Sequence, residues 1–417
     1  MSNPLLLRHS LRQANLHLRV PAFNRLFRRQ SWSTLTKGPS SLTVDTLKAT
    51  FPYVWLRDSC QSPECIHPTT SQKLHKSSDI PLDVKPIEGG VRLLDDGIAI
   101  EWKDGHKSHF PISFLERHSS RKNLVAFHKQ IVSKPWNNRI ITQTRDLFIS
   151  YGSLQTSEGM LAALKQICRY GLLFVRDVPH KETSDEKCEL STLAEMFGHI
   201  RTTFYGRLWD VRNVRNSKNV AYTNLDLGLH MDLLYLEHPP RYQILHCLRN
   251  RVQGGQSLFV DAVHCATLLQ KSHPSDFDIL AATPVAFHYI NDGHHLHREH
   301  ATIELANPSS GTPPGMISHI NYSPPFQAPL PLSTPDAFYP ALKHFTEALN
   351  DPLNTYRYTL QEGDAVIFDN RRVLHSRTAF NDIDGQEKEG ETNRWLKGCY
   401  LEADDLLDRR RVLEAKL

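Results

Sequence analysis

Residues 242–247 (YQILHC), 257–261 (SLFVD) and 365–369 (AVIFD) are short apolar runs that alternate with turn signals. Gly254-Gly255 precedes the second run, and Glu362-Gly363-Asp364 precedes the third. Short apolar runs bounded by such residues are typical of buried strands. Where these strands dominate and few helices flank them, two packed sheets of the jelly-roll type are expected. The chain is therefore predicted to be mostly β.

Helical patterns lie around these strands. Residues Thr156–Arg169 begin with a capping threonine and have helical spacing, and a buried strand is expected at 171–176. Further helices are predicted at Leu190–Phe197 and Pro335–Leu349. Pro340 should kink the last of these helices or mark its true first turn.

A smaller β-rich domain is predicted at residues 45–118. Strands are expected at Tyr53–Leu56, Gly90–Leu94 and Ile98–Trp102, with Asp95-Asp96-Gly97 as the hairpin turn between the last two. The polar stretch 119–150 is predicted to be a connection, and 151–417 the larger domain.

The first 44 residues contain seven basic and no acidic side chains, whereas the whole chain of 417 residues has a net charge of +4. This pattern predicts a mitochondrial transit peptide and a matrix location; a disordered basic tail on a cytoplasmic protein is the alternative. The remaining 42 basic and 45 acidic residues leave a net charge of −3, which argues against a nucleic-acid partner.

The number of cysteines and the hydropathy of the chain argue against two further classes of protein, disulfide scaffolds and membrane-spanning proteins. Seven cysteines in 417 residues are too few for a disulfide scaffold, and an odd number cannot all be paired within the chain. No run of 18 uncharged apolar residues occurs, so neither a membrane span nor a membrane partner is predicted.

A candidate metal motif lies in the larger domain. His230 and Asp232 are two residues apart, so on a strand their side chains would share one face. His375 follows the predicted strand 365–369. Two histidines and one carboxylate form the facial triad of non-haem Fe(II) oxygenases, which leaves positions open for a co-substrate and O2. Among 23 histidines, however, such a tripeptide is weak evidence by itself.

Arg394 provides a second clue. An oxygenase that uses 2-oxoglutarate needs a guanidinium for the distal carboxylate, and arginine binds carboxylates through two parallel hydrogen bonds. The alternative is a surface ion pair with Glu387, Glu389 or Glu391.

Several separated motifs, in order, resemble one family. These stretches are 53–60 (YVWLRDSC), 203–206 (TFYG), 220–223 (VAYT), 367–375 (IFDNRRVLH) and 398–401 (GCYL). They are similar to γ-butyrobetaine dioxygenase and trimethyllysine dioxygenase, and the resemblance extends from about residue 50 to 412.

The resemblance implies a TauD-like, Fe(II)- and 2-oxoglutarate-dependent dioxygenase of carnitine biosynthesis, with ascorbate as reductant. The implied fold is a double-stranded β-helix behind a small N-terminal zinc-binding domain, in a homodimer. Its iron ligands map onto His230, Asp232 and His375, and its 2-oxoglutarate arginine maps onto Arg394. These residues also argue against a non-catalytic binding barrel.

The zinc motif departs from the family pattern. The family has three cysteines and a downstream histidine, whereas this chain has Cys60, Ser62 and Cys65, with His106 downstream. Structural zinc prefers four cysteine or histidine ligands, so His67 is a candidate for the fourth. The alternative is a metal-free domain with two buried thiols.

The resemblance also implies an aromatic cage for a trimethylammonium group, which has no N–H donors and is recognised through cation–π contacts. Its positions match Tyr205, Trp209, Tyr222 and Tyr400, each of which could equally be a core aromatic.

Two polar positions bear on the other end of the substrate. Asn219 can donate to a carboxylate, which favours γ-butyrobetaine over trimethyllysine. Ser323 occupies the position at which the resembling enzyme has a second carboxylate-binding asparagine, and Pro324-Pro325 alters the loop that carries it. Another small amine or acid therefore remains an alternative substrate.

Overall fold

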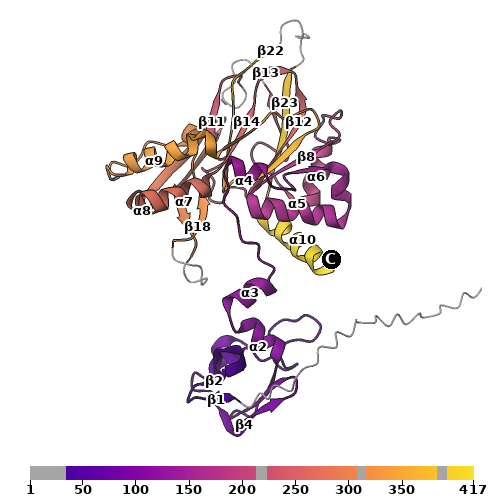
Figure 1. Ribbon diagram of the computed structural model, residues 1–417, viewed down its shortest axis with the longest axis vertical. Helices are drawn as coiled ribbons and strands as arrows, with labels where there is room; N and C mark the ends of the chain where they lie inside the picture. Colours follow the sequence, from indigo (N-terminus) through magenta and orange to yellow (C-terminus); the bar gives the residue numbers. More distant parts are fainter. Residues whose placement is uncertain (1–33, 213–222, 308–314, 383–391) are drawn as a thin grey trace, which may run out of the picture. The chain divides into compact units, whose positions relative to one another are not determined.

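The computed structural model describes residues 34–212, 223–307, 315–382 and 392–417 (Figure 1). The chain divides into two compact units, Met1–Leu124 and Val125–Leu417. None of the helices in these described stretches is both long and apolar enough to span a bilayer.

The first unit contains two three-stranded antiparallel sheets, in the orders β1-β2-β3 and β4-β5-β6. Its strands are β1 (Leu35–Lys37), β2 (Ser41–Val44), β3 (Ala49–Pro52), β4 (Pro86–Leu94), β5 (Gly97–Trp102) and β6 (Lys107–Pro111). Its helices are α1 (Tyr53–Asp58) and α2 (Ile112–His118), and α3 (Arg121–Phe127) spans the boundary between the units. The core of this unit is centred on Trp102 and Phe110, which are fully buried.

Two predictions for this unit need correction. The apolar run Tyr53–Leu56 was expected to be a strand but forms helix α1. Pro52 is extended immediately before it, and the buried side chains Tyr53 and Leu56 are three residues apart, which is helical rather than strand spacing. The described fold also begins with β1 at Leu35, before the boundary predicted at residue 45.

The second unit is built around two sheets. The larger has seven strands in the order β10-β23-β12-β20-β8-β7, with β9 also paired to β23, and the smaller has the order β11-β21-β14-β19. The strands of the larger sheet are β7 (Phe148–Ser150), β8 (Leu172–Arg176), β9 (Ile200–Arg201), β10 (Trp209–Arg212), β12 (Tyr242–Asn250), β20 (Ala365–Asp369) and β23 (Arg394–Leu401). Those of the smaller sheet are β11 (Leu227–His230), β14 (Ser257–Asp261), β19 (Thr355–Tyr358) and β21 (Val373–Arg377).

Three two-stranded ribbons extend this framework. They are β13 (Val252–Gly254) with β22 (Phe380–Asp382), β15 (Pro284–Asn291) with β16 (His294–Ala301), and β17 (Ile303–Leu305) with β18 (Ile317–Ile320).

Aromatic side chains fill the space between the two large sheets. Phe174 on β8 and Phe368 on β20 each lie 5.7 Å, centroid to centroid, from Phe259 on β14. All three are buried in one core with aliphatic residues of both sheets. The larger sheet is antiparallel apart from the parallel pair β7–β8, and the smaller sheet is antiparallel. This packing of two sheets is the double-stranded β-helix, or jelly roll, that the strand pattern predicts.

Helices cover the sheets in two groups (Figure 1). Helices α5 (Ser157–Tyr170), α6 (Glu189–Phe197) and α10 (Ala403–Lys416) pack against the larger sheet. Helices α7 (Ala262–Ser272), α8 (Pro274–Ala282) and α9 (Phe338–Asn350) form a second group with its own core. Thr156 caps α5 by accepting a hydrogen bond from the Gly159 N–H, as predicted, and Pro340 lies in the first turn of α9.

The stretch predicted to be a connection, 119–150, is more structured than expected. It contains α4 (Asn138–Thr142) and β7 as well as α3. Trp136 is fully buried, and its indole N–H donates to the carbonyl of Tyr170 at 2.6 Å. Single apolar side chains in a polar stretch give no periodic signal, so the docking of this segment was not visible in the sequence.

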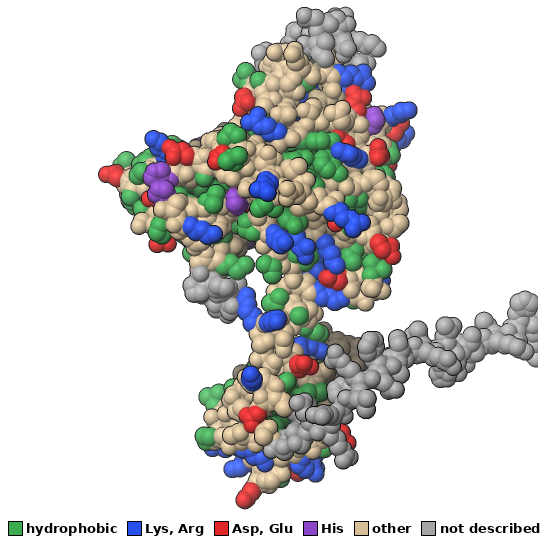
Figure 2. All heavy atoms as spheres, viewed as in Figure 1, with side chains coloured by type: hydrophobic (Ala, Val, Ile, Leu, Met, Phe, Trp, Pro, Cys, Tyr) green, Lys and Arg blue, Asp and Glu red, His purple; other side chains and the backbone are tan. Residues whose placement is uncertain are grey.

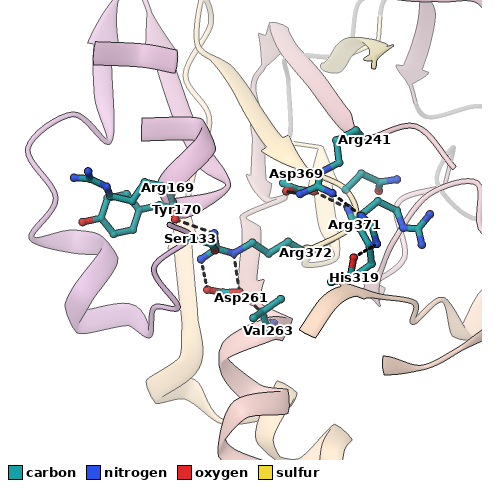
Figure 3. Close-up of polar contacts among 12 residues, drawn as sticks. Ser133, Arg169, Tyr170, Arg241, Asp261, Val263, His319, Asp369, Arg371 and Arg372 are labelled. Atoms are coloured by element: carbon teal, nitrogen blue, oxygen red, sulfur yellow. Dashed lines mark hydrogen bonds and ion pairs between the residues drawn. The ribbon is translucent and has the colours of Figure 1, made fainter. Parts of the chain in front are cut away.

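A buried ion pair joins this segment to the sheets (Figure 3). Arg372 donates to both carboxylate oxygens of Asp261 at 3.1 and 2.7 Å, and their side chains are 6% and 0% exposed. Arg372 also donates to Ser133 Oγ at 2.6 Å and to the carbonyl of Arg169 at 2.9 Å. Asp261 in turn caps α7 by accepting from the Val263 N–H.

Replacing Arg372 with methionine leaves the Asp261 carboxylate buried without its main counter-charge. Removing one member of a buried pair costs about 3–5 kcal/mol, so Arg372→Met should lower the free energy of unfolding by about this amount. The measurement is urea unfolding followed by circular dichroism. The control is Arg251→Met, because Arg251 pairs with Glu362 but is 53% exposed and its loss should cost less than about 1 kcal/mol. Equal midpoints for the two variants would contradict this role of the buried pair.

Candidate active site

The site begins at the end of β11. His230 is the last residue of this strand, and the chain turns immediately afterwards, with Leu233 at a φ of 62°. The expectation that Asp232 shares the strand face is therefore wrong, yet the two side chains meet: His230 Nε2 lies 3.4 Å from Asp232 Oδ1. His230 Nδ1 is 2.9 Å from the Gly228 carbonyl, so an N–H there leaves the Nε2 lone pair directed at the site.

Strand pairing brings in the third residue. His375 on β21 is the register partner of His230 on β11, and their ring centroids are 4.2 Å apart. One ligand atom from each of His230, Asp232 and His375 lies within 4.8 Å of the other two. Donor atoms bound at about 2 Å to one ion lie about 3 Å from each other, so this arrangement can hold a metal with little movement. His375 Nδ1 is moreover buried without a hydrogen-bond partner.

Burial and neighbouring groups favour the protonation states of His375 and Asp232 that ligation requires. Burial, reinforced by His230, lowers the pKa of His375 to about 3, so the imidazole is neutral near pH 7. Burial raises the pKa of Asp232, but His230, His375 and a hydrogen bond from Tyr400 together lower it well below its usual range. Neutral imidazoles and a carboxylate are the forms that bind metals.

The turn segment 369–372, which consists of the last residue of β20 and the three residues before β21, holds Asp232 in place. The side-chain Oδ1 of Asn370 accepts from the Asp232 N–H at 2.8 Å, and its Nδ2 donates to the Asp232 carbonyl at 3.0 Å and to the Pro240 carbonyl at 3.2 Å. Asn370 is fully buried. This contact bridges 138 residues of sequence, and no sequence signal identified it.

The other members of this turn are anchored separately (Figure 3). Asp369 pairs with Arg241 at 2.7 Å, and Arg371 donates to Glu304 at 3.2 Å. Each residue of the turn thus contacts a different segment of the fold, which fixes the start of the strand that carries His375.

Arg394 lies near the triad at the start of β23. It is 4% exposed, so it is not the surface residue of the alternative interpretation. Its Nε is buried without a hydrogen-bond partner, and no ion pair joins it to an acidic residue within the described stretches. Burial, together with Arg377, lowers the pKa of Arg394 to about 10, which leaves it cationic near neutral pH. A cavity of about 80 Å³ is lined by Arg394 and all three residues of the triad.

Three predicted cage positions can be located. Trp209 on β10 lies against Tyr400 on β23, with ring centroids 5.2 Å apart. The Trp209 ring lies directly over Gly398, where a Cβ would be 2.3 Å away, so only glycine permits this approach. Tyr400 donates from its hydroxyl to Asp232 Oδ2 at 2.8 Å. This bond to the triad carboxylate was not foreseen for a cage residue.

Tyr205 belongs to an aromatic cluster that the sequence prediction largely missed. Its ring is 4.2 Å from that of Phe204, and its hydroxyl is 3.5 Å from that of Tyr235. The cluster also contains Tyr289 and Phe326. These residues come from four separate segments, so only the fold brings them together.

Three further residues were predicted to bind the substrate or to line its pocket: Asn219, Tyr222 and Ser323. Asn219 and Tyr222 lie outside the described residues. Ser323 is 1% exposed, and its hydroxyl has no hydrogen-bond partner.

In the first unit, Cys60, Cys65 and His106 form a second candidate metal cluster. His106 Nε2 lies 3.2 Å from Cys60 Sγ and 3.5 Å from Cys65 Sγ. Burial lowers the pKa of His106, which favours the neutral ligand form. His67 is not part of this cluster, and its Nδ1 accepts from the Thr70 N–H instead. The suggestion of His67 as fourth ligand is therefore not supported by the geometry.

A jelly roll that carries two histidines, a carboxylate and a buried arginine around one cavity defines a non-haem iron oxygenase that uses a keto acid. Residues 142–400 match the model of the family described as "Taurine catabolism dioxygenase TauD, TfdA family", and residues 41–121 match "Gamma-butyrobetaine hydroxylase-like, N-terminal". The chain belongs to the TauD/TfdA family of Fe(II)- and 2-oxoglutarate-dependent dioxygenases, in its γ-butyrobetaine-hydroxylase-like branch.

Curated relatives cover most of the chain. "Dioxygenase str8" of Strobilurus tenacellus is 52% identical over 386 residues, which are 92% of this chain and 90% of that protein. The human mitochondrial trimethyllysine dioxygenase is 32% identical, covering 87% of this chain and 82% of that protein. The γ-butyrobetaine dioxygenase of Pseudomonas sp. is 31% identical, covering 92% and 96%.

Removing the Asn370 amide should weaken metal binding by the site. A buried group that loses its partner costs about 1–3 kcal/mol, so Asn370→Ala should lower the affinity of the full chain for Co(II) about tenfold or more. Co(II) titration followed by absorption measures this without turnover. Asn350→Ala, which removes an exposed amide at the end of α9, is the control and should bind as the wild type does. Wild-type affinity in a folded Asn370→Ala variant would rule out this positioning role.

Proposed function

We propose that the chain hydroxylates a small trimethylammonium substrate, namely γ-butyrobetaine, to give L-carnitine. The observation that carries the proposal is the Trp209–Tyr400 pair: Trp209 lines the cavity of the triad, and Tyr400 donates to the Asp232 carboxylate. Aromatic faces attract a quaternary ammonium group through cation–π contacts.

Within this proposal, His230, Asp232 and His375 hold Fe(II). The three side chains fit an ion because their donor atoms are close, and because the pKa shifts of His375 and Asp232 favour a neutral imidazole and a carboxylate. Arg394 binds the distal carboxylate of 2-oxoglutarate, since it is a buried cation that faces the same cavity. When bound, iron and 2-oxoglutarate supply the oxidation chemistry with O2, and ascorbate keeps the iron reduced.

The protein's own contribution is positioning. The aromatic side chains hold one end of the substrate and Asn219 donates to the carboxylate at the other, so that only one carbon lies near the iron. Tyr400 stays protonated because burial raises its pKa well above the usual value, so its hydroxyl can keep donating to Asp232.

The same chemistry on a different small substrate is a second candidate. The specific observation is the 52% identity to "Dioxygenase str8", whose description names no substrate, against 32% and 31% for the trimethyllysine and γ-butyrobetaine dioxygenases. Ser323 in place of an asparagine is in line with an altered polar end of the pocket.

The cellular setting is proposed from the sequence. The basic, acid-free leader supports import into mitochondria, and the human relative is described as mitochondrial. A homodimer is proposed from the family resemblance, and a structural zinc ion from the Cys60, Cys65 and His106 cluster.

Substrate choice can be tested by measuring succinate formation with Fe(II), ascorbate and 2-oxoglutarate. We expect γ-butyrobetaine, but not trimethyllysine, to stimulate succinate formation, because Asn219 matches a bare carboxylate. Turnover with trimethyllysine alone would replace the proposed substrate but keep the iron site. Uncoupled turnover unaffected by either compound would favour the second candidate.

The cage can be tested separately with Tyr205→Leu. Losing a desolvated cation–π contact of about 1–2 kcal/mol should raise the KM for γ-butyrobetaine about five- to thirty-fold while the KM for 2-oxoglutarate stays constant. Tyr339→Leu, at a tyrosine that is 57% exposed on α9, is the matched control. Unchanged KM for the betaine in Tyr205→Leu would exclude Tyr205 from the cage.

Zinc in the first unit is tested by metal analysis of the dialysed, Fe(II)-loaded chain. We expect the wild-type chain to hold about one zinc ion more than Cys65→Ser, because thiolates are strong zinc ligands. Cys168→Ser, at a cysteine on α5 outside the cluster, should match the wild type. Zinc-free wild-type protein would establish the metal-free alternative.

A further inference from the structure

Outside the two clusters described above, His273, Asp276 and His344 also bring three ligand atoms within 4.8 Å of one another. We propose that these residues form a further metal site, which binds a divalent transition-metal ion of the zinc class. The site belongs to the α7–α9 helical group and is independent of the proposed iron site.

Helix packing fixes the positions of the three ligands. His273 is the N-cap of α8, and Asp276 lies in the first turn of the same helix, with its N–H donating to the His273 carbonyl at 3.1 Å. His344 lies on α9, next to the fully buried Phe345. Phe277, beside Asp276, is buried in the same core, so the two helices hold the ligands at a set spacing.

The side chains already face one another. His344 Nδ1 lies 2.6 Å from Asp276 Oδ2, and the rings of His273 and His344 are stacked with their centroids 4.5 Å apart. The two histidine–carboxylate clusters of the second unit thus offer the same kinds of ligand, namely two imidazoles and a carboxylate. This combination suits zinc and neighbouring divalent ions. Ligands bound at about 2 Å lie about 3 Å apart, so an ion needs only a small opening of the 2.6 Å contact between His344 and Asp276.

A neighbouring group orients one of the rings. Ser272 Oγ is 2.9 Å from His273 Nδ1, a contact of the kind that fixes the tautomer of a metal-binding histidine. The site is open to ions: His273 is exposed, and the His344 side chain is 39% exposed. Figure 2 shows histidine side chains gathered at the surface where α8 and α9 meet.

Such an ion would join α8 to α9 across a long stretch of sequence. These helices share a core with Met231 and Leu374, which are the chain neighbours of the triad residues. We infer a structural role, in which the ion stabilises the helical layer behind the active site without entering the chemistry.

The test is zinc titration of the dialysed, Fe(II)-loaded full-length chain against a chromophoric chelator. The wild type should bind one more zinc equivalent than His344→Ala or Asp276→Asn; the second variant keeps the size of the side chain and a hydrogen bond to His344. His295→Ala, at an exposed histidine on β16, is the matched control and should equal the wild type. Zinc should raise the melting temperature of the wild type by more than that of the two variants, which keep the Cys60, Cys65 and His106 cluster.

Equal zinc stoichiometry in the wild type and Asp276→Asn would overturn the proposal. A second result would also overturn it: the wild type binds an additional zinc equivalent, but zinc raises its melting temperature no more than that of the two variants. The additional ion would then bind elsewhere.

Discussion

The pair between Arg372 and Asp261 is the contact on which the larger unit depends. It lies inside the protein, where an unpaired charge is costly, so both partners must be present together. Through Arg372 the pair reaches the segment at Ser133 and the end of α5, and through Asp261 it reaches the start of α7. One ion pair thus joins the smaller sheet, two helices and the segment preceding the larger sheet.

Arg372 belongs to the turn segment 369–372, and this segment also determines the geometry of the site. Arg372 is followed at once by β21, which carries His375, while Asn370 brackets the backbone of Asp232. Asp232 has no strand of its own, because β11 ends at His230. A ligand in an irregular segment needs outside support, and Asn370 supplies it from the turn that also leads to the other ligand strand. Two of the three proposed iron ligands are therefore positioned by four consecutive residues.

How far the sequence predicts this structure depends on the range of the interactions involved. Strands such as β12, β14 and β20, and helix α5, follow from local pattern and capping, and were expected at nearly their observed bounds. The run at Tyr53 was misassigned, because four apolar residues fit a strand and a helical turn equally well. The left-handed conformation of Leu233 and the long-range contact of Asn370 leave no local signal. The candidate iron ligands were predicted from residue type, spacing and the family resemblance, and the cage residues from the resemblance; the contacts that support them were not predicted.

In the proposed function, Tyr400 connects recognition of the substrate with binding of the metal. Its ring faces Trp209, while its hydroxyl donates to Asp232. A substitution that reshapes the pocket at Tyr400 also removes a hydrogen bond from the carboxylate that we propose as an iron ligand. Tyr289 and Phe326 belong to the aromatic cluster around Tyr205 and have no such bond to the triad among the described contacts. In the proposed function, change of substrate is therefore least constrained at the outer aromatics and at Ser323. It is most constrained at Tyr400, because this side chain belongs to the proposed cage and also donates to a proposed iron ligand.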